Sequence, residues 1–423
     1  MCFRARVGIN AGHMKVLTLI KENRGSWTSI MGYALALREQ GIDSRVLLFN
    51  GYHESPYITE VTLKSNKLVR KAFYELGRFA DLFGLSHFPN IAHIKLIKLL
   101  KEMEFDILHI ASARMVSSYL TFPWLTSIKP TIFSVTSMWA FTGHCHFSFD
   151  CDRWKTGCGE CPHLNISPSV KRDATHVEWK MKNWAYSRSK FFVVTDSTWL
   201  TEQVRESMLK SFPLYPLFEA VDTKIYRPLD KKRCRMELGI PLDKKVLMFA
   251  SVQLNEFRKG GDLLIKALKS MPQSMKREIL LLCMGQGTVN ITETLGIEVL
   301  NLGYIGDHQR KAICYSAADL FLFPTRADTF GIVSIESQAC GTPVVSFNVG
   351  GVPDHVRPGI TGYLAEPESA EDFRNGIIEL IENRSMLDAM SQQCRDSVVK
   401  KFSLELYAQR FSYLCRSLET NAA

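Results

Sequence analysis

Two acidic residues lie eight positions apart around a loop that leads into a helix. Asp328 stands in the polar loop after the apolar run 319–323, and Glu336 lies inside a helical pattern that ends at Cys340, before Gly341. A helix start offers unpaired N–H groups and about half a positive charge, which suits a phosphate. Because carboxylates do not attract phosphate, we expect the two acids to bind the hydroxyls of a ribose and of a sugar on the same diphosphate.

A basic pair follows the first strand pattern of the second half of the chain. Arg258 and Lys259 stand directly before a predicted helix, at a strand end where a diphosphate would lie. Two fixed cations stabilise the negative charge on a leaving diphosphate most strongly at the transition state. We therefore expect no cofactor for catalysis. The alternative is two exposed basic residues in a loop.

The residues around both sites resemble retaining glycosyltransferases of family 4, which have the GT-B fold. The resemblance rests on the basic pair, on Asp328-Thr-Phe-Gly-Ile-Val-Ser-Ile-Glu336, on 339–345 and on Gly350-Gly351. It implies that Glu336 holds the nucleotide ribose and that Asp328, where the family usually has Glu, contacts the donor sugar. The two acids and the two cations would form the catalytic set. Donor-binding roles are implied for Gly25, Gly285, Gly287, Thr329, Phe330, Gly331 and Ile332.

The glycines of this set lie in two turns. Gly285 and Gly287 follow the second strand pattern after the basic pair, where Gly-x-Gly is compatible with a nucleotide edge or with a plain turn. Gly25 lies in a turn where relatives commonly have two glycines. Backbone N–H groups of that turn would reach the sugar or the diphosphate.

Four cysteines lie in one loop of the first half of the chain, with C-x5-C-x6-C-x2-C spacing: Cys145, Cys151, Cys158 and Cys161. Four thiolates so close can form a tetrahedral Zn²⁺ site, which a reducing compartment favours over two disulfides. Structural zinc is therefore expected, with redox behaviour or simple packing as alternatives. Asp150-Cys-Asp152 matches the Asp-x-Asp string of metal-dependent transferases, but it does not end a strand, so we expect no catalytic metal there.

The same loop resembles a branch of family 4 from bacterial surface-polysaccharide clusters. That branch has Met-Trp-Ala, here 138–140, then Thr-Gly, here 156–157, then the cysteine set. It usually has a His-Asp pair before Met-Trp, where this chain has Thr136-Ser137. Because the family's histidine approaches donor sugar and acceptor, Thr136, Ser137 and His144 are candidate acceptor-side residues. His144 and the nearby His109 are also compatible with structural roles.

Strand and helix patterns alternate in two blocks. The first block predicts a helix over 27–40 and strands over 15–21, 44–50, 106–112, 131–137 and 191–197. The second predicts helices over 261–271 and 308–317 and strands over 245–251, 278–285, 299–305, 319–323 and 343–349. Such alternation predicts parallel sheets covered on both faces. The fold class is thus α/β, with two doubly wound (Rossmann-like) domains facing across an active-site cleft, as in GT-B.

The length of 423 residues fits two domains of about 200 residues each. We expect a disordered extension over 1–13, an acceptor-side domain over 14–212 with the Cys-rich loop 143–162, a linker over 213–232, a nucleotide-sugar-binding domain over 233–400 and a final helix over 401–423. In relatives, the final helix folds back on the first domain. Relatives often have Asn-Gly-Val-Asp-x-x-x-Phe-x-Pro in the linker, where this chain has Glu219-Ala-Val-Asp-Thr-Lys-Ile-Tyr-Arg-Pro228.

Composition is typical of a globular protein, with 46% hydrophobic and 22% charged residues. Residues 1–13 lack the apolar core of a signal peptide and the chain has eleven cysteines, so we expect a cytoplasmic protein. The net charge of +9 could steer phosphate or anionic lipid, and the absence of a recognition motif argues against nucleic acid. Basic amphipathic patterns over 65–84 and 90–104 fit either peripheral contact with the cytoplasmic face of a membrane or ordinary surface helices.

The expected function is transfer of a hexose-type sugar from a nucleotide diphosphate sugar to a hydroxyl of a glycan, with retention of configuration. The acceptor is expected to be lipid-linked, in the synthesis of a surface polysaccharide such as lipopolysaccharide or capsule. One alternative is a non-catalytic nucleotide-sugar-binding partner subunit, which Thr136-Ser137 favours. The other is a nucleotide-sugar epimerase or phosphorylase on the same fold.

Overall fold

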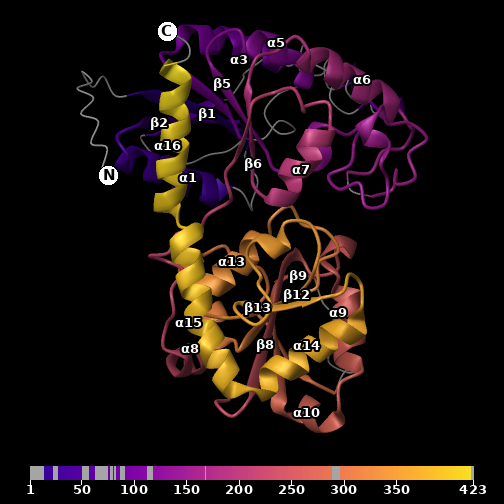
Figure 1. The fold of residues 1–423 in the computed structure, drawn as a ribbon, viewed down its shortest axis with the longest axis vertical. Helices are drawn as coiled ribbons and strands as arrows, with labels where there is room; N and C mark the ends of the chain where they lie inside the picture. The colour runs from indigo at the N-terminus through magenta and orange to yellow at the C-terminus, as the bar shows by residue number, and fades with distance from the viewer. Residues whose placement is uncertain are drawn as a thin grey trace, which may run out of the picture. The chain divides into compact units, whose positions relative to one another are not determined.

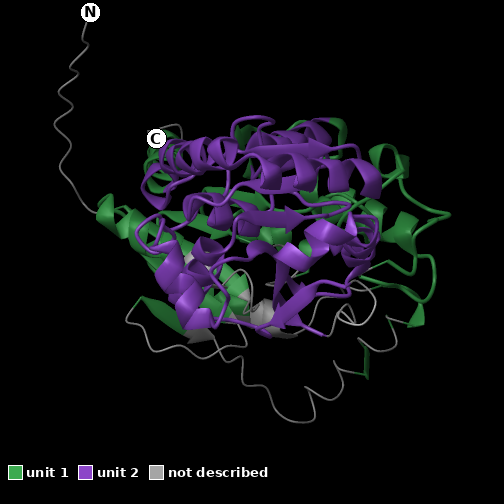
Figure 2. Ribbon diagram, turned by 90° about the horizontal axis from the view of Figure 1, so that it is seen from below, with its two compact units in different colours: residues 1–194, 206–215, 408–423 green, residues 195–205, 216–407 purple. Residues whose placement is uncertain are grey.

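The computed structural model of the chain describes residues 14–21, 27–49, 57–61, 75–76, 80, 82–85, 91–111, 118–166, 168–287 and 296–420. The predicted extension 1–13, Gly25 and most of the basic pattern 65–84 lie outside these residues. The chain divides into two compact units (Figure 2). The first consists of residues 1–194, 206–215 and 408–423, and the second of residues 195–205 and 216–407.

The first sheet has seven strands in the order β3-β2-β1-β4-β5-β6-β7. Figure 1 labels four of them, β1, β2, β5 and β6. Its strands are β1 (Lys15–Lys21), β2 (Asp43–Phe49), β3 (Ile58–Val61), β4 (Ile107–Ile110), β5 (Thr131–Val135), β6 (Phe192–Thr195) and β7 (Leu214–Pro216). The pairings among β1 to β5 are parallel. The described helices before the second sheet are α1 (Trp27–Glu39), α3 (Ile91–Glu102), η1 (Tyr119–Thr121), α5 (Phe122–Leu125), η2 (Met138–Ala140), η3 (Arg153–Lys155), α6 (Thr175–Tyr186) and α7 (Thr198–Glu206).

The second sheet has six strands in the order β10-β9-β8-β11-β12-β13, all paired in parallel. Its strands are β8 (Lys245–Gln253), β9 (Ile279–Gln286), β10 (Glu298–Asn301), β11 (Leu320–Phe323), β12 (Val344–Phe347) and β13 (Gly362–Ala365). The remaining described helices are α8 (Lys231–Leu238), η4 (Phe257–Lys259), α9 (Gly261–Lys269), α10 (Gln273–Glu278), α12 (His308–Ala317), α13 (Ile332–Ala339), η5 (Val352–Asp354), α14 (Ala370–Glu382), α15 (Arg384–Lys401) and α16 (Leu404–Thr420).

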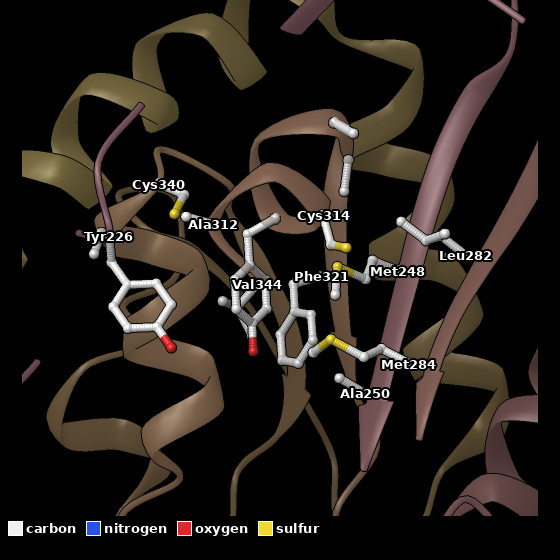
Figure 3. Close-up of a cluster of buried hydrophobic side chains, with 14 of the residues drawn as sticks. Tyr226, Met248, Ala250, Leu282, Met284, Ala312, Cys314, Phe321, Cys340 and Val344 are labelled. Atoms are coloured by element: carbon white, nitrogen blue, oxygen red, sulfur yellow. The ribbon is translucent and has the colours of Figure 1, made fainter. Parts of the chain in front are cut away.

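The second sheet has an apolar core on each face, which makes this unit doubly wound. Successive side chains of a strand point to opposite faces, so β8 divides its residues between the two cores. Val246, Met248 and Ala250 pack with residues of α12 and α13, whereas Leu247 and Phe249 pack with residues of α9 and α14. Figure 3 shows the first of these clusters, including Met248, Ala250, Leu282, Met284, Phe321 and Val344. The prediction of a parallel sheet covered on both faces is confirmed.

The predicted elements are present in both blocks. All ten predicted strands exist, β1 and α12 have the predicted bounds, and Gly341 closes α13 with a left-handed φ of 78°. Three short strands were not predicted, namely β3, β7 and β13. β7 lies inside the segment 213–232 expected to be a linker, where it forms the edge of the first sheet. Pro216 ends this strand, and proline is tolerated on an edge because no ladder N–H is needed there.

Among the described residues, no helix combines the length and the apolar character needed to cross a membrane. The basic pattern 90–104 forms α3, where Leu96 and Leu100 are buried and Lys98 and Lys101 are exposed. The apolar side of this helix therefore packs inside its own unit, which leaves its lysines as the groups available to an anionic surface.

Candidate active site

The predicted catalytic residues of the second unit follow two strands at the point where the strand order reverses. β8 is followed along the chain by β9 and β10 on one side, whereas its other neighbour is β11, which leads to β12 and β13. Arg258 and Lys259 follow β8, and Asp328 follows β11. In open parallel sheets, ligands bind beyond the carboxyl ends of the strands at this switch point. The two motifs thus meet at the position where such a sheet binds its ligand.

Hydrogen bonds join the segment after β8 (residues 254–260, the β8 loop) to the segment after β11 (residues 324–331, the β11 loop). The Arg258 carbonyl accepts from the Arg326 N–H at 2.8 Å and from the Thr325 hydroxyl at 3.1 Å. In return, Nη1 of Arg258 donates to the Ala327 carbonyl at 2.9 Å. Arg326 also binds Asp262 through two nitrogens, at 2.8 and 2.6 Å. The two loops are therefore held as one structure.

Two glycines permit the close approach of these segments. Gly260 has a φ of 68°, and a Cβ on it would lie 1.8 Å from the Pro324 carbonyl oxygen. Gly350 has a φ of 52°, and a Cβ there would lie 2.0 Å from the Asp328 carbonyl oxygen. Only glycine fits such positions without displacement of the backbone. This gives the Gly350-Gly351 pair of the sequence motif a structural reason, since Gly351 also donates its N–H to the Asp328 carbonyl at 3.1 Å.

The two cations and the first acid form one ion-paired cluster. Oδ2 of Asp328 lies 2.8 Å from Nζ of Lys259 and 3.1 Å from Nη1 of Arg258. Burial raises the pKa of Asp328, but the charges of Lys259 and Arg258 outweigh this effect and lower it to about 2. The carboxyl group is therefore ionised at neutral pH. Nε of Arg258 also lies 2.9 Å from Oε1 of Glu256, so the cluster holds two cations and two carboxylates. The carboxylates fix the two cations in position, and charged N–H donors of this kind suit an anionic ligand.

The second acid, Glu336, is bound by two phenol hydroxyls, with a lysine at longer distance. Tyr226 donates its hydroxyl to Oε1 and Tyr315 donates its hydroxyl to Oε2, both at 2.9 Å. Nζ of Lys311 lies 3.7 Å from Oε1. Glu336 is 4% exposed, so its few partners determine its orientation. Neither tyrosine was selected from the sequence, although Tyr226 stands where relatives often have Phe.

The start of α13 is held by a buried histidine that the sequence analysis also missed. Gly331, with a φ of 90°, precedes the helix. His355 Nε2 lies 2.7 Å from the Phe330 carbonyl, and Nδ1 lies 3.1 Å from Nε2 of Gln338. Burial lowers the pKa of His355 to about 4, so the ring is neutral at pH 7. Because a carbonyl only accepts, Nε2 carries the proton and Nδ1 accepts from Gln338. In the sequence, only the position of His355 four residues after Gly351 could have indicated this histidine.

The other predicted donor residues occupy different surroundings. Thr329 and Phe330 are buried, and the Phe330 ring packs on His355, Phe218 and Phe402. The Phe330 side chain thus attaches the β11 loop to the core of the second unit. Gly285 and Gly287 line a pocket with Gln286, Asn301, Gly303 and Tyr304. Gly285 is required for packing as well, because a Cβ there would lie 1.9 Å from the Ser251 carbonyl oxygen.

Two further carboxyl groups interact with this site. Burial raises the pKa of Glu219 to about 7, with added repulsion from Asp328 and Glu336. Burial also raises the pKa of Asp196, and Glu219 and Asp328 add to the effect. Neither residue was selected from the sequence. Both carboxyl groups lie near enough to Asp328 for its charge to raise their pKa.

The acceptor-side candidates lie in the first unit. Thr136 is exposed, and the Ser137 hydroxyl lies 2.9 Å from Nδ1 of His146, a histidine that the sequence analysis did not name. His144 is buried, with Nδ1 at 2.9 Å from the Pro168 carbonyl and Nε2 at 3.3 Å from the Cys161 sulfur. His109 is buried between the Thr18 and Ser134 hydroxyls. The last two rings are therefore bound within the fold, whereas His146 is the imidazole beside Ser137.

The cysteine loop (residues 143–162) has an unusual backbone. Three of the four described non-glycine residues with positive φ lie in it: Phe149 at 51°, Cys158 at 37° and Glu160 at 44°. All four cysteines are free thiols, and burial raises the pKa of Cys145 to about 11 and that of Cys158 to about 12. Within the described residues, no set of three or more His, Cys, Asp or Glu side chains is arranged to hold one metal ion. Zinc therefore stays a prediction from the sequence.

One family model matches a stretch within the second unit. Residues 230–397 match the family model described as "Glycosyl transferases group 1". D-inositol 3-phosphate glycosyltransferase 1 from Catenulispora acidiphila is 32% identical over 192 residues, which are 42% of this chain and 45% of that protein. The match thus spans under half of the relative's length. The family model spans residues 230–397 and so includes no residue of the cysteine loop or of the first unit.

Solved structures match almost the entire chain at low identity. Sucrose-phosphate synthase from Thermosynechococcus elongatus has a TM-score of 0.72 and 18% identity, over 97% of this chain and 100% of that one. Anabaena HepE, solved in complex with UDP and glucose, has a TM-score of 0.68 and 16% identity, over 96% of this chain and 100% of that one. WaaG, described as a glycosyltransferase involved in lipopolysaccharide biosynthesis, has a TM-score of 0.63 and 16% identity, over 95% and 99%. The chain thus has the two-domain fold of these GT-B proteins, and its residues 230–397 carry the sequence pattern of the group 1 glycosyl transferases.

Proposed function

We propose that the protein transfers a sugar from a nucleotide diphosphate sugar to a hydroxyl group of a lipid-linked glycan, with retention of configuration. The observation that carries this proposal is the cluster of Arg258, Lys259 and Asp328 at the switch point of the second sheet. It lies within the residues that match the group 1 glycosyl transferases. Curated relatives of this region are named as glycosyltransferases, and HepE was solved with UDP and glucose.

The cluster is suited to the departure of a diphosphate. The bond from the anomeric carbon to the phosphate oxygen breaks, and negative charge grows on the leaving group. Arg258 and Lys259 are fixed near that charge by Asp328, so their stabilisation increases toward the transition state and requires little reorganisation. The cations supply the positive charge that a metal ion supplies in other transferases. Asp328 also presents acceptor oxygens to the hydroxyls of the donor sugar.

Retention requires that the new bond form on the face that the diphosphate leaves. The acceptor oxygen bonds to the anomeric carbon on that face, and its proton passes to an oxygen of the leaving phosphate. The leaving group then serves as the base, so that no protein nucleophile is needed. Atoms and charges balance, since the products are the glycoside and the protonated nucleoside diphosphate.

The acceptor side is inferred from the first unit. The Met-Trp-Ala, Thr-Gly and cysteine pattern resembles transferases of surface-polysaccharide clusters, and the matched WaaG is described as acting in lipopolysaccharide biosynthesis. Ser137 and His146 are the polar pair beside this pattern, at 2.9 Å. We infer a lipid-linked acceptor at the cytoplasmic face of a membrane, with peripheral contact through basic residues. Because exposed charges are screened within about 10 Å at 0.1 M salt, high salt should release the protein from membranes, and release by detergent alone would contradict this contact.

The test of the function is a donor screen with two readouts. The full-length protein is incubated with UDP-, GDP- and ADP-linked sugars, alone and with lipid extracted from membranes. We expect slow release of nucleoside diphosphate from one donor alone and a glycolipid product when the lipid is present. Lys259→Met serves as the inactive control. Donor binding without hydrolysis or transfer would favour the non-catalytic subunit, and conversion of one nucleotide sugar into another would favour an epimerase.

A further inference from the structure

The environment of Glu336 contains a feature that goes beyond the motif. The carboxylate is reached by two phenol hydroxyls from different segments, Tyr226 before α8 and Tyr315 on α12. Both rings belong to the buried core cluster of the second unit, and Figure 3 shows Tyr226 in it. The exposed fractions of Tyr226, Tyr315 and Glu336 are 3%, 0% and 4%. The acid and its two donors are thus fixed within a packed interior.

The direction of each hydrogen bond follows from the chemistry of the groups. Burial raises the pKa of Tyr226 and of Tyr315, and the Glu336 charge raises both further, so both phenols keep their protons. A carboxylate oxygen accepts, so each tyrosine donates its hydroxyl to Glu336. Tyr226 donates its single hydroxyl proton to Glu336, and its oxygen also lies 2.5 Å from Nδ1 of His308. His308 must therefore donate, which gives the chain His308 Nδ1–H to Tyr226 to Glu336.

The backbone that carries Tyr226 is held from another helix. Nη1 of Arg395 donates to the Tyr226 carbonyl at 2.7 Å and to the Ala339 carbonyl at the end of α13 at 3.2 Å. Nη2 of Arg395 donates to the Thr223 carbonyl at 3.0 Å. One guanidinium thus joins the turn that bears Tyr226 to the helix that bears Glu336. The backbone of Tyr226 and the end of α13 are thereby fixed relative to each other.

The two tyrosines leave part of the hydrogen-bond acceptor capacity of Glu336 unused. A carboxylate has about four lone-pair positions, and the two tyrosines occupy one on each oxygen. Each oxygen thus keeps about one acceptor position that no described hydrogen bond occupies, with Nζ of Lys311 at 3.7 Å from Oε1. Two hydroxyl groups on neighbouring carbons, as in a ribose, match such a pair of acceptors. A ligand without these hydroxyls would leave them unsatisfied, and a buried unmet acceptor disfavours that ligand.

We propose that Tyr226 and Tyr315 are positioning residues that orient Glu336 for the adjacent hydroxyls of a ribose, and so make the site selective for ribonucleotides. This inference rests on the proposed function, because it places the nucleoside of the donor at Glu336. It extends that function from the acid itself to the groups that aim it. His308 strengthens the arrangement because its N–H polarises the Tyr226 hydroxyl toward the carboxylate.

The test pairs each variant with a ligand that lacks the hydroxyls. UDP, GDP, ADP and CDP are titrated calorimetrically, each beside its 2′,3′-dideoxy form, against wild type, Tyr226→Phe, Tyr315→Phe and the double variant. Wild type should prefer the tightest-binding ribonucleotide over its dideoxy form by about 10-fold or more. Tyr226→Phe should weaken binding of the ribonucleotide by about 10-fold and leave that of the dideoxy form within about 2-fold. The double variant should abolish the preference.

Tyr363→Phe is the matched control. Tyr363 also donates its hydroxyl to a carboxylate in the second unit, that of Asp372 at 2.7 Å, but it has no contact with Glu336 among the described interactions. This variant should keep the full preference for the ribonucleotide. Circular dichroism and thermal melting establish that each variant is folded before titration.

The other possible results separate the role of the tyrosines from the proposed function. Equal weakening of both ligand forms in Tyr226→Phe would reduce the tyrosine to a structural role and overturn the inference. Wild type that binds a ribonucleotide and its dideoxy form equally well would also overturn it, while the proposed function stands. If wild type binds none of the four nucleotides, both fall.

Discussion

Two loops of the molecule carry chemically active side chains, and they are built in opposite ways. The β11 loop meets the β8 loop through glycines at the left-handed positions, and its charged groups are paired, as at Lys259 and Asp328. The cysteine loop instead places Cys158 and Glu160, which carry Cβ atoms, at positive φ, and its thiols have no disulfide. A non-glycine residue in this region costs about 1–2 kcal/mol.

The difference indicates what holds each loop. The β11 loop is held to the β8 loop by several hydrogen bonds and ion pairs, some of which do not involve the catalytic side chains, so we expect its chemistry to be changeable while the fold is kept. The cysteine loop depends on groups outside it. Trp179 of α6 donates its ring N–H to the Trp154 carbonyl at 2.8 Å, and Asp173 accepts from the Cys161 N–H at 2.6 Å. Directly before the loop, the fully buried Lys182 of α6 donates to the Trp139 and Thr142 carbonyls at 2.6 and 2.8 Å. We expect changes in the β11 loop to affect rate and changes around the cysteine loop to affect stability.

The largest effect is expected for Lys259→Met. The substitution keeps the length of the side chain and removes one of the two cations, while Arg258 still pairs with Asp328. The loss of one transition-state contact of this kind costs roughly 3–4 kcal/mol, or about 10²–10³ in rate. The fall should lie mainly in kcat, measured on the donor that the screen identifies, with an unchanged melting temperature. Lys266→Met, at an exposed position of α9, is the control. Unchanged turnover in Lys259→Met would mean that the diphosphate binds elsewhere.

Next in size is the effect of Lys182→Met, on stability instead of rate. Loss of the ammonium leaves two buried carbonyls without their donor, so we expect a decrease of roughly 3 kcal/mol in the free energy of unfolding. Urea titration followed by tryptophan fluorescence measures it, since Trp139 and Trp154 report on this loop. Lys180→Met, an exposed position of the same helix, should change nothing. Equal stabilities of the two variants would show that the loop does not depend on the buried lysine.

Third, we expect a bound metal ion to compensate for the backbone strain of the cysteine loop. We expect protein purified under reducing conditions to contain about one zinc per chain by elemental analysis, and Cys158→Ser to lose it. Cys283→Ser, in the core of the second unit, should keep the metal. Wild-type zinc below about a tenth of an equivalent would leave the loop to be held by packing alone.

The smallest effect is expected for Glu160→Gly, which should stabilise the protein. Glycine adopts the φ of 44° without penalty, and about 1 kcal/mol should be gained. The exposed ion pair with Arg153 contributes little, and Arg153 still binds the carbonyls of residues 159 and 160. Glu160→Ala removes the same ion pair but keeps the strain, so it should not stabilise. Equal melting temperatures for both variants would mean that φ at residue 160 costs nothing.

The sequence predicted long, regular elements well because their periodicity is local. β1 and α12 have the predicted bounds, and the ten predicted strands are present. The strands β3, β7 and β13 contain an acidic residue, a proline and a glycine and form no continuous apolar run, unlike β4 and β11, which are equally short but were predicted. Each of the three exists because a neighbouring strand offers it a partner.

The predicted site residues were less complete, because side-chain partners lie far apart in the chain. Asp328 and Lys259 were assigned to a sugar and to a phosphate, whereas the structure shows them paired with each other across 69 positions. Tyr226 is 110 positions from Glu336, and no spacing rule could connect them. In the first unit the imidazole on Ser137 belongs to His146, two residues from the histidine that the sequence suggested. Motifs identify the reacting groups, but their partners follow only from the fold.

The division of the chain into units has a consequence for how the protein is made. The first unit contains residues 1–194, but it also needs residues 408–423, whose Phe411 ring packs 5.0 Å from His109 and whose Arg416 binds the Gln40 carbonyl. During synthesis the N-terminal part of most chains folds first, as an independent domain. Here the first unit cannot be completed until the last segment has left the ribosome, after the second unit has already been translated. Fragments that end before residue 408 should therefore expose the apolar surface around His109 and depend on chaperones, and the C-terminus is a poor site for truncation.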